Sequence, residues 1–371
     1  MARRKQLSES RDEAALPWPQ PWDNGQLAGH EAAEAKILQS VLSGRLPHAW
    51  LISGPRGIGK STLAHRFARF LLAGETGGGL FGAPESLAVD MELPQIRRMR
   101  VGAHPDFRRI ERSLDDNGRL RGEIVIADVR DLGEFMHLTP AEGGWRIAII
   151  DAADEMNRNS ANALLKLLEE PPRRAVLILV AHSPGRLLPT VRSRCRHLPL
   201  HPLSDEQVGA LIDLYLPGID AAQKRLSIGL AEGSAGQALS LARAGSLDLY
   251  ETLIGLLGSL PRLDTAALHG FADKVARRGE ESEAAWRALV FLLDWWLQRF
   301  LRSAASGEAA APLVQKEQGL ADRLAGAASL DRWLEAWEKI GHLFARADAV
   351  NLDRKQVTLG AFFALQAAMT S

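Results

Sequence analysis

The chain has 371 residues, and at about 100–200 residues per domain this length predicts two or three domains. Hydrophobic residues make up 46% of the chain and charged residues 24%, which excludes disordered and fibrous proteins. Lys plus Arg and Asp plus Glu number 45 each, so the net charge is zero and any contact with nucleic acid must be local or shared with partners.

Cysteine content and hydropathy indicate the cellular compartment in which the protein is expected. Cys195 is the only cysteine, which excludes an internal disulfide and any multi-cysteine metal site. The N-terminus shows no apolar stretch typical of a signal peptide, and no apolar run reaches the roughly 18–20 residues that a membrane helix needs. We therefore expect a cytoplasmic protein outside the membrane.

The first half of the chain alternates between two kinds of pattern. Residues 1–24 contain three prolines in alternation and predict a flexible N-terminal arm. Over residues 25–202, short apolar runs predict strands, and 3.6-residue patterns between them predict helices. The expected strands are 49–53, 106–110, 146–151 and 175–181, and the expected helices are 31–42, 60–72, 126–137 and 160–170. This order is typical of βαβ units and predicts an α/β domain whose parallel sheet carries helices on both faces.

After residue 202 the strand signal ends. Helical patterns at 204–215, 220–232 and 234–244, the first with Ser204 as N-cap, predict a small helical domain over residues 203–246. Tryptophan-rich helical patterns at 283–302 and 331–344 predict an all-helical domain over residues 247–371, with an Ala-rich loop at 303–311. Because these apolar faces exceed what a small core needs, we expect the last domain to drive oligomerisation.

A phosphate-binding loop follows the first predicted strand directly. The segment GPRGIGKST matches G-x-x-x-x-G-K-[ST] and opens a predicted helix. Such glycines let backbone N–H groups converge on phosphate oxygens, while the Lys reaches the β- and γ-phosphates and the Ser can hold Mg²⁺. We therefore predict that ATP and Mg²⁺ are bound by Gly54, Pro55, Arg56, Gly57, Ile58, Gly59, Lys60, Ser61 and Thr62.

A second nucleotide element ends the strand RIAIID. Asp151 at its end is the candidate ligand for Mg²⁺, with Ser61. The next residue is Ala152, where hydrolysing relatives have a Glu that orients the attacking water. Asp154 and Glu155 lie three and four residues after Asp151, and we interpret them as solvated charges near the start of a helix.

Three further motifs make the sequence similar to a known family. The run NALLKLLEEPP at 162–172, the triplet SRC at 193–195 and AHPDF at 103–107 resemble the clamp-loader branch of the AAA+ ATPases. The resemblance implies an AAA+ domain, a helical lid and a helical collar, in a five-subunit ring of bacterial DNA polymerase III that uses ATP to place a sliding clamp on primed DNA. It also implies partners of the delta and gamma/tau type, and contact with the clamp and DNA through the complex.

Departures from the family pattern indicate which type of subunit this is. Motor subunits carry Glu at position 152 and Arg at position 236, where this chain has Ala and Gly, and no cysteine in 74–103 could hold the zinc of many relatives. The resemblance therefore implies a stator-like subunit of the delta-prime type that binds ATP, hydrolyses it poorly and contains no polymerase active site. Arg194 of the SRC triplet would be an arginine finger that acts in trans on a neighbour's nucleotide.

Three interpretations stay open at this point. The chain could be a self-sufficient motor subunit whose water is activated by Glu155 or Asp154, or an unrelated P-loop protein such as a small-molecule kinase. A basic stretch could face DNA, although we favour a solvated, charge-balanced surface for it. Its members are Arg97, Arg98, Arg100, Arg108, Arg109 and Arg112.

Overall fold

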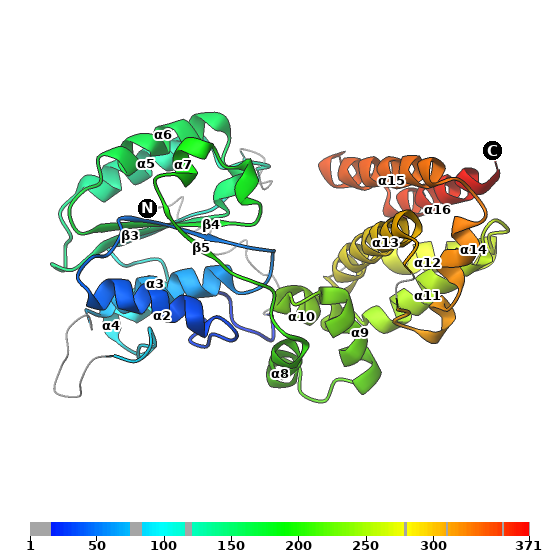
Figure 1. The fold of residues 1–371 in the computed structure, drawn as a ribbon, viewed down its shortest axis with the longest axis horizontal. Coiled ribbons are helices and arrows are strands. Elements are labelled where there is room, and N and C mark those ends of the chain that lie inside the picture. The colour runs from blue at the N-terminus through cyan, green and yellow to red at the C-terminus, as the bar shows by residue number, and fades with distance from the viewer. Residues whose placement is uncertain are drawn as a thin grey trace. The chain divides into compact units, whose positions relative to one another are not determined.

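The computed structural model describes residues 16–74, 84–115, 121–277, 280–308, 311–350 and 352–370. It contains two compact units, each with its own architecture (Figure 1). An α/β unit comprises Leu16–Gln207 with the short segment Gly233–Gly236. A helical unit comprises Val208–Glu232 and the chain from Gln237 onward.

A five-stranded parallel sheet forms the centre of the α/β unit. Its spatial order is β2-β3-β4-β1-β5, so the first strand in sequence lies between β4 and β5. All pairs are parallel, which places the carboxyl ends of all strands at one edge. The bounds are β1 (Ala49–Ser53), β2 (Phe107–Ile110), β3 (Arg146–Asp151), β4 (Ala175–Ala181) and β5 (Arg196–Pro199).

Helices cover both faces of this sheet, as the sequence predicts (Figure 1). Alternate residues of one strand enter different cores: Trp50 and Ile52 pack with α2 and α3, and Leu51 packs with α5 and α6. The helices of this unit are α2 (Glu31–Leu42), α3 (Lys60–Ala73), α4 (Pro94–Arg100), α5 (Ile126–His137), α6 (Arg158–Glu169) and α7 (Pro189–Arg192), with 3-10 turns η1 (Ala153–Glu155) and η2 (Pro184–Arg186).

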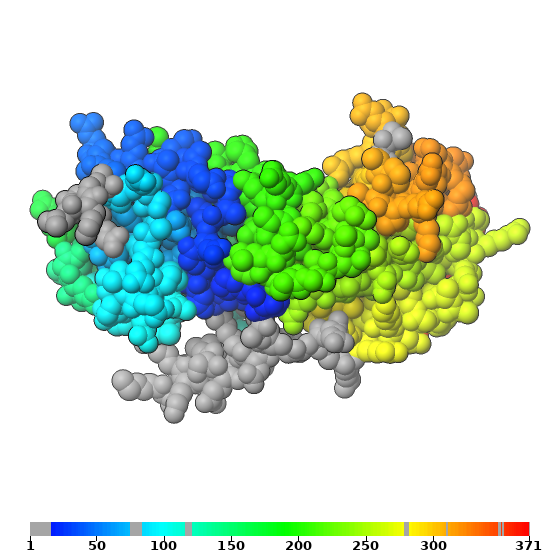
Figure 2. All heavy atoms as spheres, turned by 90° about the horizontal axis from the view of Figure 1, so that it is seen from below, coloured from blue at the N-terminus to red at the C-terminus, as the bar shows by residue number. Residues whose placement is uncertain are grey.

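Strand β5 and the short helices α4 and α7 were not predicted from the sequence. Strand β5 is exposed at three of its four residues, so it shows no apolar run, and pairing with β1 defines it. Helix α4 has seven residues and starts at Pro94, and it packs against α3 through Ile96 and Met99. The surface around α4 lies beside that of α2 (Figure 2).

The predicted flexible arm of residues 1–24 needs a correction at its C-terminal end. Residues 1–15 lie outside the described residues, but residues 16–24 are tied to the α/β unit. The guanidinium of Arg69, which is 1% exposed, donates to the carbonyl groups of Trp22 (3.2 Å) and Asn24 (2.6 Å). The Arg109 guanidinium lies 3.9 Å from the Trp22 ring centre. The alternating prolines prevent a regular helix, and the segment instead makes a bend and a turn at residues 21–23, with carbonyls that accept these hydrogen bonds.

The second unit contains only helices among its described residues. Helix α8 starts where predicted, and Ser204 caps it reciprocally with Gln207: the Gln207 N–H donates to the Ser204 hydroxyl, and the Ser204 N–H to the Gln207 side chain. The bounds are α8 (Asp205–Tyr215), α9 (Ala221–Ala231), α10 (Ala235–Arg243), α11 (Ser246–Ser259), α12 (Thr265–Ala276), α13 (Glu280–Ser306), α14 (Leu320–Ala325), α15 (Leu330–Val350) and α16 (Arg354–Thr370), with a 3-10 turn η3 (Gln315–Glu317).

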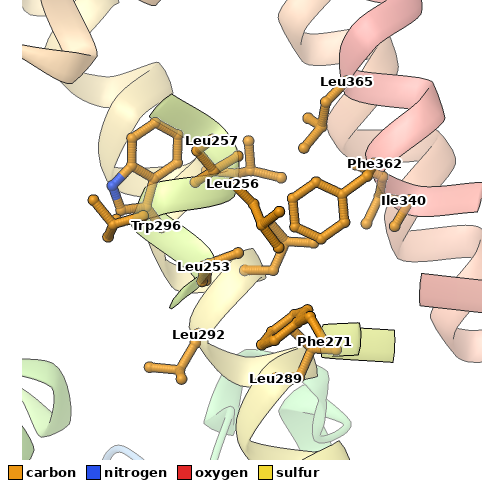
Figure 3. Close-up of a cluster of buried hydrophobic side chains, with 14 of the residues drawn as sticks. Leu253, Leu256, Leu257, Phe271, Leu289, Leu292, Trp296, Ile340, Phe362 and Leu365 are labelled. Atoms are coloured by element: carbon orange, nitrogen blue, oxygen red, sulfur yellow. The ribbon is translucent and has the colours of Figure 1, made fainter. Parts of the chain in front are cut away.

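One continuous core holds this unit together (Figure 3). Leu253, Leu289, Trp296 and Phe362 come from three helices distant in sequence and meet inside it. Leucines of α9 and α10 join the same cluster, so the helices predicted as a separate lid share a core with those that follow. The predicted loop at 303–311 begins later than expected, because α13 extends to Ser306. The division at residues 202, 246 and 247 stays a prediction.

Candidate nucleotide site

The predicted phosphate loop links the centre of the sheet to α3. It leaves β1 at Gly54, whose φ is 146° and where a Cβ atom would lie 2.4 Å from the Leu200 carbonyl oxygen. Only glycine fits there. Gly57 and Gly59 also have positive φ, and Gly59 is the N-cap of α3. The loop therefore delivers the unpaired N–H groups of a helix start to the carboxyl edge of the sheet, an arrangement that favours anions.

The ammonium group of Lys60 lies inside this loop. Lys60 is 3% exposed, and its Nζ donates to the Pro55 carbonyl oxygen of the same loop. Burial lowers its pKa to about 8, although the charges of Asp151 and Asp154 act in the opposite direction. No carboxylate among the described residues forms an ion pair with Lys60. A buried cation of this kind gains from a negatively charged ligand, and the donor set of the loop fits a phosphate chain.

Asp151 and Ser61 lie together at the mouth of the loop. Asp151 ends β3, and burial raises its pKa while the Ser61 hydroxyl and the Lys60 charge partly lower it. A hydroxyl and a buried carboxylate are ligands that suit Mg²⁺ coordinated by a nucleotide. These are the two residues that the sequence predicts as Mg²⁺ ligands, and their role as ligands stays a prediction.

Asp154 corrects one of the sequence interpretations. It was expected to be solvated, yet it is 9% exposed and accepts hydrogen bonds from the N–H groups of His182 (3.0 Å) and Ser183 (2.7 Å) just after β4. Its carboxylate caps backbone groups that the end of the strand leaves unpaired. Glu155 is also committed, to an ion pair with Arg112 at 2.8 Å. Both carboxylates are therefore engaged in contacts within the domain that compete with a role as general base.

The segment that carries Gly236 lies directly on the phosphate loop. The Gly236 N–H donates to the Gly57 carbonyl oxygen at 2.9 Å, and a Cβ atom at position 236 would lie 3.2 Å from the Gly57 Cα. Gly233 is equally confined, since its Cβ atom would meet Pro202 and Leu203 at 2.5–2.9 Å. The backbone at position 236 is thus packed against the phosphate loop, with little room for a side chain.

His30 is a contact of the loop that the sequence analysis missed. This buried residue precedes α2, and its Nε2 lies 2.6 Å from the Ile58 carbonyl oxygen, to which it donates. The bond links two segments 28 residues apart and supports the apex of the loop. A single histidine before a helix gives no sequence signal for such a role, because the partner is a backbone group.

Arg194 lies away from these groups, between α7 and β5. Its Nη2 is 2.9 Å from the Glu169 Oε1, and its Nη1 donates to the Thr190 carbonyl oxygen at 3.0 Å. The side chain is 37% exposed. Neighbouring Cys195 is part-buried, and burial raises the pKa of its thiol to about 12, which disfavours the thiolate form that a nucleophile needs.

The basic stretch is largely engaged in contacts within the domain. Ion pairs join Arg98 to Glu142, Arg100 to Asp23 at 2.7 Å, and Arg112 to Glu155. The remaining described contacts include Arg108 over Phe135 and Arg109 over Trp22. The stretch is charge-balanced, as expected, but most of its partners are distant in sequence.

Within the described part of the chain, no group of three His, Cys, Asp or Glu side chains is arranged to hold a metal ion. No helix in that part is both long and apolar enough to cross a membrane.

The α/β unit is similar to known proteins. The model of the family described as "DNA polymerase III, delta subunit" matches residues 29–204. The chain is thus similar to this family over just under half of its length. The DNA polymerase III subunit delta' of Pseudomonas aeruginosa is 39% identical over 162 residues, 43% of this chain and 45% of the relative. That of Bacillus subtilis is 32% identical over 172 residues, 46% of this chain and 47% of the relative.

The match to other subunits is longer but weaker. The DNA polymerase III subunit tau of Escherichia coli is 28% identical over 329 residues, 83% of this chain and 48% of the relative. The chain thus spans about half the length of the curated relatives it matches. The resemblance to delta-prime subunits of the clamp-loader family, inferred from the motifs, is confirmed.

Solved structures show distant likeness. A gamma subunit-related protein from Thermotoga maritima has a TM-score of 0.41 at 19% identity, covering 90% of this chain and 99% of its own. RuvB from the same organism has a TM-score of 0.40 at 16% identity, covering 84% and 89%. The predicted fold class, an AAA+ α/β domain followed by helical domains, agrees with the sheet and helices described above.

Proposed function

We propose that the chain is a delta-prime-type, stator-like subunit of a DNA polymerase III clamp loader in the bacterial cytoplasm. The family match over residues 29–204 carries this proposal, because that region contains both the phosphate loop and the SRC triplet. Its partners would be delta-type and gamma/tau-type subunits, and it would meet the sliding clamp and primed DNA through the complex. The role in DNA replication belongs to the complex as a whole.

Its own phosphate loop would bind ATP with Mg²⁺ but turn it over slowly. Lys60 would hold the terminal phosphates, and Ser61 and Asp151 would hold the metal, which supplies charge neutralisation when bound. Hydrolysis also needs a group that orients water, and position 152 offers only a methyl group. Asp154 and Glu155 are occupied by backbone N–H groups and by Arg112. These contacts weigh against the alternative of a self-sufficient motor subunit.

Arg194 would act on the nucleotide of an adjacent motor subunit. As a γ-phosphoryl group transfers, negative charge grows on its oxygens, and a fixed guanidinium stabilises this charge more than the ground state. The Arg194 side chain is partly exposed, so its guanidinium would be able to reach a nucleotide across a subunit interface. Its catalytic effect would therefore appear in the rate of the complex rather than in nucleotide binding by this chain.

Two measurements test the proposal. The isolated chain should bind a fluorescent ATP analogue with Mg²⁺, and Lys60→Ala should abolish binding. Phosphate release should stay far below about one turnover per second, the lower end of typical enzyme rates. In the reconstituted complex, Arg194→Ala should slow clamp- and DNA-stimulated hydrolysis at least about tenfold at the interface it serves, given that arginine fingers contribute about 10³-fold or more.

Controls make this result specific. Arg194→Lys should rescue poorly, since an ammonium cannot copy the planar two-donor contact. Arg196→Ala, which removes an exposed arginine two residues away, should leave the rate unchanged. Wild-type rates from an assembled Arg194→Ala complex would show that the arginine-finger assignment is wrong.

A further inference from the structure

The Arg194 guanidinium makes contacts within its own subunit that the role of an arginine finger does not require. Its guanidinium is held from two sides, by the Glu169 carboxylate at 2.9 Å and by the Thr190 carbonyl at 3.0 Å. Arginine has five N–H donors and these contacts use two, so three remain for another ligand. The arginine is therefore oriented within its own subunit and still able to bind an anion.

The place of Glu169 is unusual for a carboxylate. It is the last residue of α6, where the negative end of the helix dipole disfavours an acidic side chain. Lys166 is the basic residue of that last turn. Its single positive charge is followed by two consecutive negative charges, Glu169 and Glu170. A residue that breaks a local rule in this way is a candidate for a functional role. The Arg194 guanidinium offsets the charge of Glu169.

The exposure of the pair determines what it can do. The Glu169 side chain is 50% exposed and that of Arg194 37% exposed, so solvent screens their attraction and the pair adds little to folding. A weak pair can nevertheless restrict a long side chain that would otherwise sample many rotamers. The three remaining donors can then contact a phosphate group while the contacts to Glu169 and the Thr190 carbonyl stay in place.

We propose that Glu169 is the positioning residue of the arginine finger, and that with the Thr190 carbonyl it preorganises the Arg194 guanidinium for the nucleotide of the adjacent subunit. This inference rests on the proposed function. A catalytic group that is held in place loses less freedom on reaching the transition state, so the gain belongs to the rate of the chemical step. Binding of ATP by the motor subunit would not depend on Glu169.

The test compares four reconstituted complexes that carry wild-type chain, Glu169→Ala, Arg194→Ala or both changes. We expect Glu169→Ala to lower the rate of stimulated ATP hydrolysis at the interface that Arg194 serves about two- to fivefold, the range of an exposed ion pair, with KM for ATP unchanged. In the Arg194→Ala background the same change should have no further effect, because Glu169 acts only through that arginine. Glu169→Gln, which keeps a hydrogen-bond acceptor, should show a smaller loss.

Glu170→Gln is the matched control, since it removes the same charge one residue along and should leave kcat at the wild-type value. An unchanged rate in Glu169→Ala, a faster one, or a loss that persists without Arg194 would each overturn the positioning role. The first of these results together with a slow Arg194→Ala complex would leave the proposed function intact. If Arg194→Ala also matches the wild type, the finger assignment itself is wrong and the positioning role fails with it.

Discussion

Lys60 shows how a single buried charge can make nucleotide binding depend on pH. Burial lowers the pKa of its ammonium group from 10.5 to about 8, so the free protein loses this charge as the pH rises through 8. A bound triphosphate would raise that pKa again, and binding above pH 8 must then take up a proton. The terminal phosphate is fully ionised in this range and adds no titration of its own.

We therefore expect the affinity for ATP to be constant from pH 7 to 8 and to fall by up to about tenfold per pH unit above it. Equilibrium titration with a fluorescent nucleotide at fixed ionic strength would measure this. Lys60→Arg is the control, because its guanidinium stays charged and its weaker binding should show no such slope. A wild-type affinity that is flat to pH 10 would contradict the lowered pKa.

Gly236 illustrates how close backbone packing can restrict a position. A Cβ atom there would lie 3.2 Å from the Gly57 Cα and 3.4 Å from its carbonyl oxygen, so the phosphate loop would have to shift by a few tenths of an ångström. In a helix start, alanine is otherwise favoured over glycine by up to about 1 kcal/mol. We expect Gly236→Ala to weaken nucleotide binding without loss of overall stability.

Measurement of the dissociation constant and of the melting temperature for Gly236→Ala separates the two effects. Gly258→Ala, where a Cβ atom meets nothing within 4 Å, is the matched helical control. Restoring the arginine of the motor subunits with Gly236→Arg should likewise fail to restore hydrolysis, because it adds the same Cβ atom and position 152 still lacks a carboxylate. An unchanged nucleotide affinity in Gly236→Ala would show that the loop absorbs the extra atom.

At the scale of elements, residues 16–24 act as a structural segment of the α/β unit. Removing them takes both backbone acceptors from the buried guanidinium of Arg69, and the Asp23 carboxylate from Arg100. A buried polar group that loses its partners costs about 1–3 kcal/mol, and more when it is charged. A chain that begins at residue 25 should therefore unfold at lower urea concentration than one that begins at residue 16.

The chain beginning at residue 16 keeps all of these contacts, which makes it the matched reference for this comparison. We expect a loss of about 2–5 kcal/mol in the free energy of unfolding of the α/β unit, from one buried cation and one partly exposed ion pair. Equal denaturation midpoints and slopes for the two chains would mean that the α/β unit does not need the segment.

At the scale of the whole molecule, the two units have separate hydrophobic cores. The α/β unit has one hydrophobic cluster on each face of its sheet, and the helical unit has a cluster among helices α9 to α16. A ligand that binds only the folded α/β unit stabilises that unit by mass action. ATP with Mg²⁺ should then raise the melting temperature of one calorimetric transition and leave that of the helical unit in place. The shift should vanish in Lys60→Ala, and an equal shift of both transitions would show that the units unfold as one.

The sequence alone determined much of the α/β unit. Four of the five strands and the main helices around them follow from buried apolar runs and 3.6-residue patterns, whose cause is local. The phosphate loop could also be read directly, because its glycines, Lys60 and Ser61 are contiguous and sit between a strand and a helix. The family followed from motifs of the same contiguous kind.

Only the tertiary structure decided which side chains are committed to partners. The sequence predicts a solvated Asp154. In the structure its carboxylate accepts hydrogen bonds from the N–H groups after β4, because β4 and β3 are neighbours in the sheet. Strand β5, the fixed segment 16–24, the backbone contact at Gly236 and the pair of Glu169 with Arg194 likewise depend on groups many residues away. Hydrogen bonds to backbone atoms and exposed ion pairs leave no periodic signal in a sequence, whereas burial of apolar side chains does.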